Sequence, residues 1–178
     1  MARIVVEATK NANFKEIFGA KSYQIPDTNM IQGRAEFKTQ NYMIDDSTIQ
    51  DFFDSRVTGG FASYYESYGA SIVCTAEYKN MNYVAVILGA TRTFAENGWQ
   101  PVNYGNFNEM ASLLEYAFSS FKINRIIYED MALSTFKVNG GECNAVGQAT
   151  VNVDSVVPVN AQMKNIQMNY KAVDGGLT

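Results

Sequence analysis

The sequence predicts an α+β fold in which helices pack on an antiparallel sheet and a small all-β module follows. Residues 70–78 and 83–88 have the patterns of two long strands, and the short turn between them predicts a hairpin. Residues 106–121 repeat apolar side chains at helical spacing, which predicts an amphipathic helix. After residue 124, short β-rich segments alternate with turns that contain Gly, Asn or Pro.

The N-terminal segment is predicted to cover the core rather than to form it. Residues 2–10 predict a short helix, and apolar spacing continues through residues 14–18 until Gly19 stops it. Residues 23–26 and 35–39 predict two short, partly exposed strands, because Asp, Asn and Gly between them favour turns.

The central segment supplies the predicted sheet. Residues 52–58 predict a strand that ends at Gly59-Gly60, where the backbone turns or approaches another group closely. Residues 70–78 alternate, with one face made of Ile72, Cys74, Ala76 and Tyr78. Residues 83–88 form a continuous apolar run, which predicts a strand buried on both faces in the middle of the sheet. Lys79-Asn80-Met81 is the predicted hairpin turn.

The third part of the prediction is a loop, a helix and a β-module. Residues 91–105, which include Trp99, are expected to form a polar loop. Asn106, with Glu109 three residues later, is an N-cap signature for a helix that runs to about Phe121. Beyond it, four short segments predict a small sandwich or barrel-like module: residues 126–128, 133–138, 149–157 and 166–170. A boundary at residues 122–124 therefore separates a domain of residues 1–122 from a β-rich domain of residues 123–178.

Composition excludes several functions. A chain that is 47% hydrophobic, with 11 Tyr and 11 Phe, has enough apolar material for a packed core, so disorder is not expected. The formal net charge of −4 argues against a nucleic-acid partner, since phosphate binding needs clustered Lys and Arg. The chain has no histidine, which excludes Ser-His-Asp and Cys-His catalysis and His-bearing zinc sites within it. We expect neither a metal nor a cofactor.

The cysteines do not indicate a redox compartment, and the N-terminus lacks a targeting signal. Cys74 and Cys143 belong to no metal-spaced cluster, and buried thiols are favoured over a disulfide. Residues 1–10 do not have the pattern of a signal peptide, and no run of eighteen apolar residues predicts a membrane-spanning helix. Either the protein is cytosolic, or its targeting segment lies outside this chain.

The order of these segments resembles the C-terminal portion of the serine D-alanyl-D-alanine carboxypeptidases, the low-molecular-mass penicillin-binding proteins. The resemblance implies a partial transpeptidase-type antiparallel sheet with packed helices, followed by the β-rich domain appended to these enzymes. It is carried by Met1–Ala8 with Asn13–Ile17, Val57-Thr58-Gly59 at the K-T-G motif, Gly69–Ala90, Leu113–Phe118, Val138–Gly141 and Val156–Pro158.

The resemblance implies a substrate-binding strand. Thr58 would donate its hydroxyl to the substrate carboxylate, and the N–H group of Gly60 would supply half of an oxyanion hole. Gly59 and Gly60 would let a peptide backbone approach closely. The expected partner is a peptidoglycan stem peptide or a β-lactam. Without the resemblance, Thr58-Gly59-Gly60 is most simply the end of a strand.

The lysine of the K-T-G motif is replaced by Val57, which can neither donate a hydrogen bond nor attract an anion. Arg56 and Arg92 are the two candidates to replace its charge. Arg56 is out of register by one residue and would project to the opposite strand face unless a β-bulge re-aims it. Both arginines can also be read as solvated surface charges.

No catalytic residue is assigned. Family members use an S-x-x-K serine at a helix N-terminus, an S-x-N element and the K-T-G strand. Ser119 and Ser134 have the S-x-x-K spacing, but Ser119 lies at a predicted helix C-terminus and Ser134 in a predicted strand. S-x-N does not occur. In the family order, both elements precede the segment that begins this chain.

Three functions are therefore considered. The leading expectation is a truncated piece of a peptidoglycan carboxypeptidase, inactive alone, whose parent protein lies in the extracytoplasmic cell envelope. The alternatives are a non-catalytic peptidoglycan-binding or scaffold protein, which Val57 favours, and an unrelated α+β binding domain. Without the family's neighbouring strands, residues 83–88 would become an exposed sheet edge, so a homo-oligomer is also expected.

Overall fold

The computed structural model describes residues 1–47, 49–96, 98, 101–137, 140–162, 164, 166–169, 172–173 and 176–177. The chain divides into two compact units, Met1–Phe118 and Ser119–Thr178. Helices and antiparallel strands occur together, which confirms the predicted α+β class. Trp99, Val138, Asn139 and Tyr170, which the sequence places in predicted elements, lie outside the described residues.

The first unit is built on a three-stranded antiparallel sheet of β3 (Val57–Tyr65), β4 (Gly69–Tyr78) and β5 (Met81–Ala90), in the order β3-β4-β5. The predicted hairpin joins β4 to β5. Its turn residues Lys79 and Asn80 have φ values of 50° and 63°, as the two central residues of a type I′ turn require.

Two predictions about these strands are wrong. Residues 50–52 form a short 3-10 helix, η1 (Gln50–Phe52), and β3 begins at Val57 and continues through Gly59 and Gly60 instead of ending there. Among the described strands β4, not β5, is the central one, and Leu88 of β5 is 69% exposed. A continuous apolar run is typical of a strand that is buried on both faces, but in the described sheet this run belongs to an edge strand.

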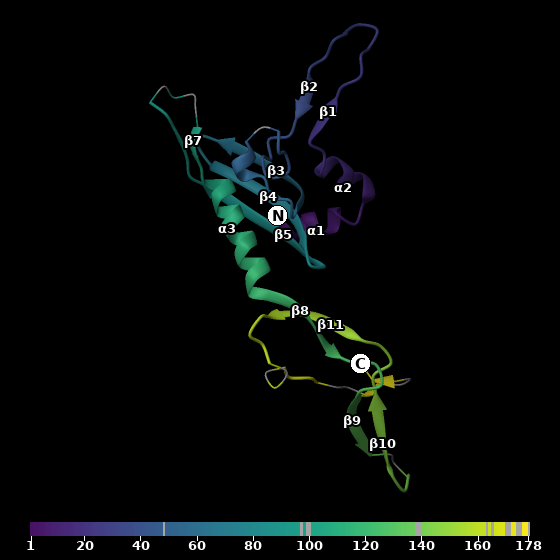
Figure 1. The fold of residues 1–178 in the computed structure, drawn as a ribbon. Coiled ribbons are helices and arrows are strands. Elements are labelled where there is room, and N and C mark those ends of the chain that lie inside the picture. Colours follow the sequence, from purple (N-terminus) through teal and green to yellow (C-terminus); the bar gives the residue numbers. More distant parts are fainter. Residues whose placement is uncertain are drawn as a thin grey trace. The chain divides into compact units, whose positions relative to one another are not determined.

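The core lies between the sheet and α3 (Gly105–Ser120), the long helix that follows one face of the sheet in Figure 1. Alternate residues of β4 point into it, as predicted. Ala70, Ile72, Cys74 and Ala76 are buried, whereas Tyr78 at the end of the strand is exposed. The larger side chains of this core are Met43, Ile44, Ile72, Met81, Phe107, Met110, Leu114 and Phe118.

The predicted N-cap of α3 is wrong. The helix begins at Gly105, one residue before Asn106, and Asn106 is buried in its first turn with 2% of its surface exposed. The N–H group of Gly105 donates to the carbonyl oxygen of Thr91. A Cβ on Gly105 would collide with that same oxygen, so the approach of Thr91 requires glycine there.

The other elements of this unit lie around the sheet. Helices α1 (Ala2–Ala8) and α2 (Ala12–Phe18) lie on the side of the sheet away from α3, with α1 against β5 and α2 against β3 (Figure 1). The two short strands that were predicted near residues 23–26 and 35–39 are present as β1 (Ser22–Gln24) and β2 (Glu36–Lys38), and they pair with each other. The predicted loop contains another hairpin, made of β6 (Arg92–Phe94) and β7 (Pro101–Tyr104).

The second unit is β-rich, and its described strands form three two-stranded antiparallel pairs rather than a closed sandwich or barrel. Residues 166–169, predicted as part of a strand, have no regular secondary structure. Arg125 and Asp154 link one pair through an ion pair of 2.9 Å. The pairs are β8 (Phe121–Ile127) with β11 (Val153–Pro158), β9 (Ala132–Lys137) with β10 (Asn144–Gln148), and β12 (Ala172–Val173) with β13 (Gly176–Leu177).

The two cysteines are free thiols in different surroundings. Cys74 is fully buried in the core, and this burial raises the pKa of its thiol to about 12. Cys143 is exposed, so the prediction that both thiols are buried is wrong for it. None of the described helices has the length and apolar character needed to cross a bilayer.

Candidate functional site

Thr58 occupies a β-bulge near the start of β3. Val57 is paired with Ala76 of β4 and Gly59 with Thr75, the next residue back along that strand, so Thr58 is an extra residue without a partner of its own. Val57 turns into the core and is 8% exposed, whereas Thr58 is exposed. The Thr58 hydroxyl donates to the Thr75 hydroxyl at 2.9 Å.

Thr58 faces a hollow of about 490 Å³ that lies between the sheet and helices α1 and α2. We call it the Thr58 hollow. Lys15 of α2 and Glu77 of β4 are the two residues of opposite charge that line it. Sequence reasoning missed Lys15, because no motif connects α2 to the start of β3. The polar residues among those that line the hollow are Thr9, Lys15, Thr58, Thr75, Glu77, Asn82 and Tyr83.

The two glycines after Thr58 are required by packing. A Cβ on Gly59 would lie 3.0 Å from the carbonyl oxygen of Phe18 at the end of α2. A Cβ on Gly60 would collide with the side-chain amide of Asn41 and lie 2.5 Å from the carbonyl oxygen of Val73. Close contacts inside the protein therefore account for both glycines, and their presence is not by itself evidence of a ligand.

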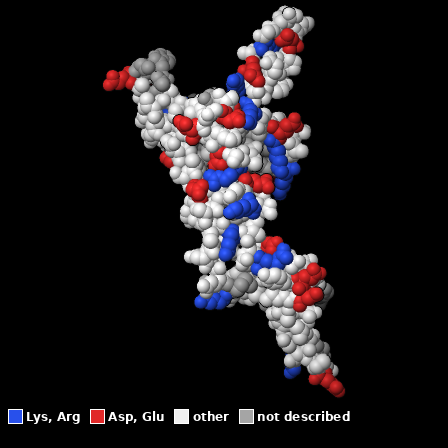
Figure 2. Space-filling view, in the orientation of Figure 1, with Lys and Arg blue, Asp and Glu red and all other residues white. Residues whose placement is uncertain are grey.

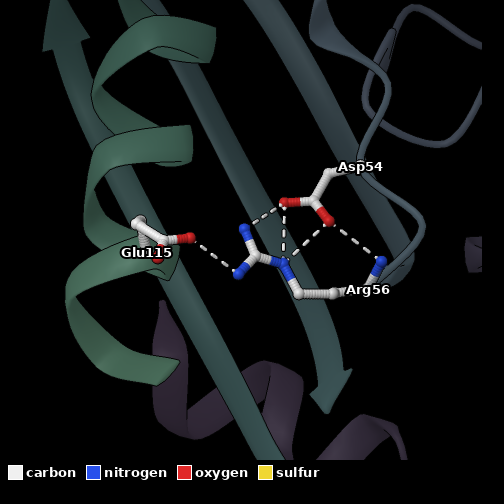
Figure 3. Close-up of polar contacts among 3 residues, drawn as sticks. All are labelled: Asp54, Arg56 and Glu115. Carbon is white, nitrogen blue, oxygen red and sulfur yellow. Dashed lines mark hydrogen bonds and ion pairs between the residues drawn. The ribbon is translucent and has the colours of Figure 1, made fainter. Parts of the chain in front are cut away.

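Arg56 is held by two carboxylates (Figure 3). Its Nη2 lies 2.8 Å from Asp54 Oδ2, and its Nη1 lies 2.9 Å from Glu115 Oε2 on α3. The guanidinium carbon is also 5.2 Å from the centre of the Phe118 ring. Partial burial would raise the pKa of Asp54, but hydrogen bonds from the Arg56 side chain and backbone outweigh it and lower this pKa.

The surroundings of Arg56 decide which site it can serve. The β-bulge that could re-aim it is present, but at Thr58, and Arg56 remains directed at Asp54 and Glu115. It does not line the Thr58 hollow. The hydrogen bonds that Arg56 donates to Asp54 also raise the pKa of Arg56 well above its usual range, so the group stays a cation.

Arg92 lies at a different hollow. Its guanidinium carbon is 5.1 Å from the ring centre of Tyr64, 5.6 Å from that of Phe94 and 4.8 Å from that of Tyr104. It lines a hollow with Ser63, Tyr64 and Asn106, at the end of β3 farther along the chain from Thr58. The structure thus brings Lys15, rather than Arg56 or Arg92, to the Thr58 hollow.

The two S-x-x-K matches lie where the sequence predicts them. Ser119 is in the last turn of α3, and Ser134 and Lys137 lie in β9, three positions apart, so their side chains project to opposite faces. Neither serine lines the Thr58 hollow. In the described part of the chain, no three His, Cys, Asp or Glu side chains gather as metal ligands would.

An antiparallel sheet with α3 on one face and two short helices on the other, followed by a β-rich unit, is the fold of part of a penicillin-binding protein. Among solved structures, penicillin-binding protein 5 from Haemophilus influenzae aligns with a TM-score of 0.60 and 19% identity over 98% of this chain and 45% of that one. A peptidoglycan synthesis regulatory factor (PBP3) from Streptococcus pneumoniae aligns with a TM-score of 0.61 and 21% identity, over 89% and 41%.

These similarities establish the fold alone, because the identities are low. The chain spans less than half the length of each of these two structures. No protein-family profile matches the sequence, and no curated protein matches it either.

Proposed function

We propose that this chain contributes the substrate-binding strand of a peptidoglycan D-alanyl-D-alanine carboxypeptidase. The observation that carries the proposal is the bulge in β3, which turns Thr58 out of the edge strand of a penicillin-binding-protein fold and towards a hollow. The matching order of sequence segments supports the same assignment. A stem peptide that ends in D-Ala-D-Ala, or a β-lactam, is the proposed ligand.

The proposed roles follow from the residues around the hollow. An extended peptide would lie along β3, and its main chain would supply much of the affinity. Thr58 would donate to the terminal carboxylate, and the N–H group of Gly60 would donate to the scissile carbonyl oxygen. Lys15 would provide the positive charge that Val57 cannot, since Val57 is in the core.

Catalysis itself is assigned to groups outside this chain. We propose that residues 1–122 form the C-terminal half of a transpeptidase-like domain and residues 123–178 a small β-rich domain. The nucleophilic serine and its lysine would come from the rest of the whole protein, in the extracytoplasmic cell envelope. A nucleic-acid ligand is not proposed, because basic and acidic side chains are interspersed on the face of the described residues that Figure 2 shows.

A non-catalytic peptidoglycan-binding or scaffold protein is the second candidate. Val57 favours it, because a buried valine at the position of the motif lysine removes the charge next to the proposed nucleophile. The two candidates share the binding strand and differ in whether a serine is ever acylated.

Binding is tested by NMR titration of the ¹⁵N-labelled chain with diacetyl-lysyl-D-alanyl-D-alanine. We expect saturable shifts of the amides of β3 around Thr58. Thr58→Val and Lys15→Gln should each lower the affinity for the peptide by about tenfold, because each variant loses one charge-assisted hydrogen bond. Thr93→Val, an exposed threonine of β6, is the matched control and should leave binding unchanged. Equal binding of the L-alanyl-L-alanine peptide, or no effect of Thr58→Val, would contradict the proposal.

Acylation is tested separately with a fluorescent penicillin and a denaturing gel. We expect no covalent label on this chain, because neither S-x-x-K serine lines the Thr58 hollow. A labelled band that disappears in Ser119→Ala or Ser134→Ala would overturn the assignment of the nucleophile to another part of the protein.

The exposed edge of β5 leads to a proposal about assembly. In the described part of the chain no strand pairs with the outer edge of β5, and residues 81–90 contain neither a charge nor a proline that would protect it. We propose that two copies pair along this edge. Light scattering after size exclusion should show dimers at high concentration, which Val86→Lys should abolish; a strict monomer at all concentrations would contradict this pairing.

A further inference from the structure

Thr75 of β4 is the residue that stands opposite the β-bulge in β3. Two residues of β3, Thr58 and Gly59, face this single residue, because Gly59 is its register partner and Thr58 is the extra residue. The Thr75 hydroxyl accepts a hydrogen bond from the Thr58 hydroxyl at 2.9 Å and donates one to the carbonyl oxygen of Gly59 at 3.4 Å. One side chain of β4 therefore contacts both residues of the bulge.

Both threonines belong to the Thr58 hollow. They are among the residues that line it, and Thr58 is exposed whereas Thr75 is half-buried. The neighbours of Thr75 in β4, Cys74 and Ala76, are buried in the core under α3, so Thr75 projects from the opposite face of the sheet. Thr58 is thus the more accessible of the two hydroxyl groups to a ligand.

The direction of this hydrogen-bond chain matters for an anion. The hydrogen of the Thr58 hydroxyl is directed at Thr75, so its oxygen offers lone pairs, which repel a carboxylate. Thr58 donates to a carboxylate only after its hydrogen rotates away from Thr75. Thr75 is then able to give up its long bond to the Gly59 carbonyl oxygen and to donate to the Thr58 oxygen instead.

The reversed chain makes Thr58 the better donor to a carboxylate. Hydrogen bonds in a chain polarise one another, and those to a charged acceptor are the stronger ones. The exchange gives up only the longer of the two bonds, and it leaves neither hydroxyl without a partner. Without the Thr75 hydroxyl, Thr58 would donate alone.

We propose that Thr75 is a positioning residue for recognition of the ligand carboxylate. It holds the Thr58 hydroxyl at the bulge and, once the ligand is bound, donates a hydrogen bond to it. Thr75 acts through Thr58 and does not itself touch the ligand. This inference rests on the function proposed for Thr58, and it adds a residue that no motif in the sequence indicates.

The test is an NMR titration of the full ¹⁵N-labelled chain with diacetyl-lysyl-D-alanyl-D-alanine and with its C-terminal carboxamide. Thr75→Val keeps the shape of the side chain and should lower the affinity for the carboxylate peptide by about fivefold, the effect of one hydrogen bond. The affinity for the carboxamide should fall by less than about twofold, because a neutral oxygen gains less from a polarised donor. A general disturbance of the strand would lower both affinities alike.

Further variants separate positioning from packing. Thr75→Ser keeps the hydroxyl and should bind the carboxylate peptide within about twofold of the wild type, whereas Thr75→Ala should repeat the loss seen in Thr75→Val. Thr58→Val/Thr75→Val should bind no more weakly than Thr58→Val, since Thr75 acts through Thr58. Thr93→Val is the control that should leave both affinities unchanged, and a well-dispersed spectrum shows that each variant is folded.

A measurement without ligand tests the same contact. Three-bond couplings from the Thr58 methyl carbon to its backbone nitrogen and carbonyl carbon report the χ1 torsion of Thr58. We expect a single rotamer in the wild type and in Thr75→Ser, and averaging over rotamers in Thr75→Val, because the 2.9 Å contact between the hydroxyl groups is lost.

Several outcomes would overturn the role of Thr75. These are an unchanged carboxylate affinity in Thr75→Val, equal losses for the two peptides, and additive losses in the double variant. If Thr58→Val weakens binding while Thr75→Val does not, this inference fails and the proposed function stands. If the wild-type chain binds neither peptide, the proposed function fails and the inference fails with it.

Discussion

The two faces of the β3–β4–β5 sheet differ in how completely they are covered. On the face towards α3, Ile72, Cys74 and Leu114 are among the most deeply buried side chains of the protein. On the opposite face, Phe61 of β3 remains 64% exposed, and Thr58 borders a hollow. The same three strands provide both surfaces, because successive side chains of a strand point to opposite sides.

This comparison shows how one strand serves stability and a candidate site together. The bulge in β3 lets Val57 enter the closed face while Thr58, the next residue, remains on the open one. A residue inserted by a bulge is free of the pairing that restricts its neighbours. Substitutions on the closed face should therefore change stability, and those on the open face should change binding.

The largest expected effect is on the closed face. Leu114→Ala should lower the free energy of unfolding by about 2–5 kcal/mol, because it leaves a cavity between α3 and the sheet. Phe61→Ala, on the open face, should change it by about 0.5 kcal/mol. Chemical denaturation measures both values. Similar losses for the two variants would mean that the faces are equally important to the fold.

Gly60→Ala tests the packing of β3 against its neighbours. The added Cβ collides with the Asn41 amide and Val73, so we expect a loss of about 1–3 kcal/mol. Ser63→Ala, at a half-buried position of the same strand, is the control and should cost about 0.5 kcal/mol. Should Gly60→Ala be as stable as the wild type in thermal denaturation, the close contacts around Gly60 would not be required.

Asp54→Asn tests the ion pairs of Arg56. It should destabilise the protein by about 1–3 kcal/mol at pH 7, because a partly buried guanidinium loses its main charged partner. Glu115→Gln removes the more exposed partner and should cost about 0.5 kcal/mol.

The same ion pair predicts a pH dependence. The pKa of Asp54 is lower in the folded state than in the unfolded chain, because Arg56 donates hydrogen bonds to its carboxylate, so its contribution to stability is complete above about pH 5 and is lost as the pH falls through the folded pKa. The difference between wild type and Asp54→Asn, measured by urea unfolding, should therefore decrease below about pH 4. A difference that stays constant down to pH 2 would contradict this linkage.

Labelling of the two thiols perturbs the fold least, and it tests whether the closed face of the sheet stays closed in the native protein. The native protein should react rapidly with a thiol reagent at Cys143 only, because burial raises the pKa of Cys74 to about 12 and excludes the reagent. In denaturant, both thiols should react. Cys143→Ser is the control and should leave no fast phase; fast labelling of Cys74 in the native state would show that the core under α3 opens readily.

Sequence patterns predicted the elements that have strong local signals. The alternation in residues 70–78 correctly assigned Ile72, Cys74 and Ala76 to the core, and helical spacing identified α3. Short-range signals were misleading where a tertiary contact decides the outcome. Asn106 has the sequence context of an N-cap. The close approach of Thr91 to Gly105 instead lets the helix begin one residue earlier, so Asn106 lies buried in its first turn.

The candidate sites were predicted less completely. The sequence pointed to Thr58 and Arg92, but not to the place of Lys15 at the same hollow as Thr58 or of Asn106 at the same hollow as Arg92. These juxtapositions join residues that are far apart in the chain. No periodicity or motif contains them, since they depend on how α2, β3 and α3 pack.

By itself, the sequence determined the α+β class, the β4–β5 hairpin, α3 and the order of segments that resembles a penicillin-binding protein. Local backbone preferences and side-chain periodicity act over a few residues, and they are sufficient for these features. Only the tertiary structure decided that β3 runs through its glycines with a bulge at Thr58, that Arg56 is held between Asp54 and Glu115, and that two separate hollows result. Each of these depends on which groups come within contact distance after the chain has folded.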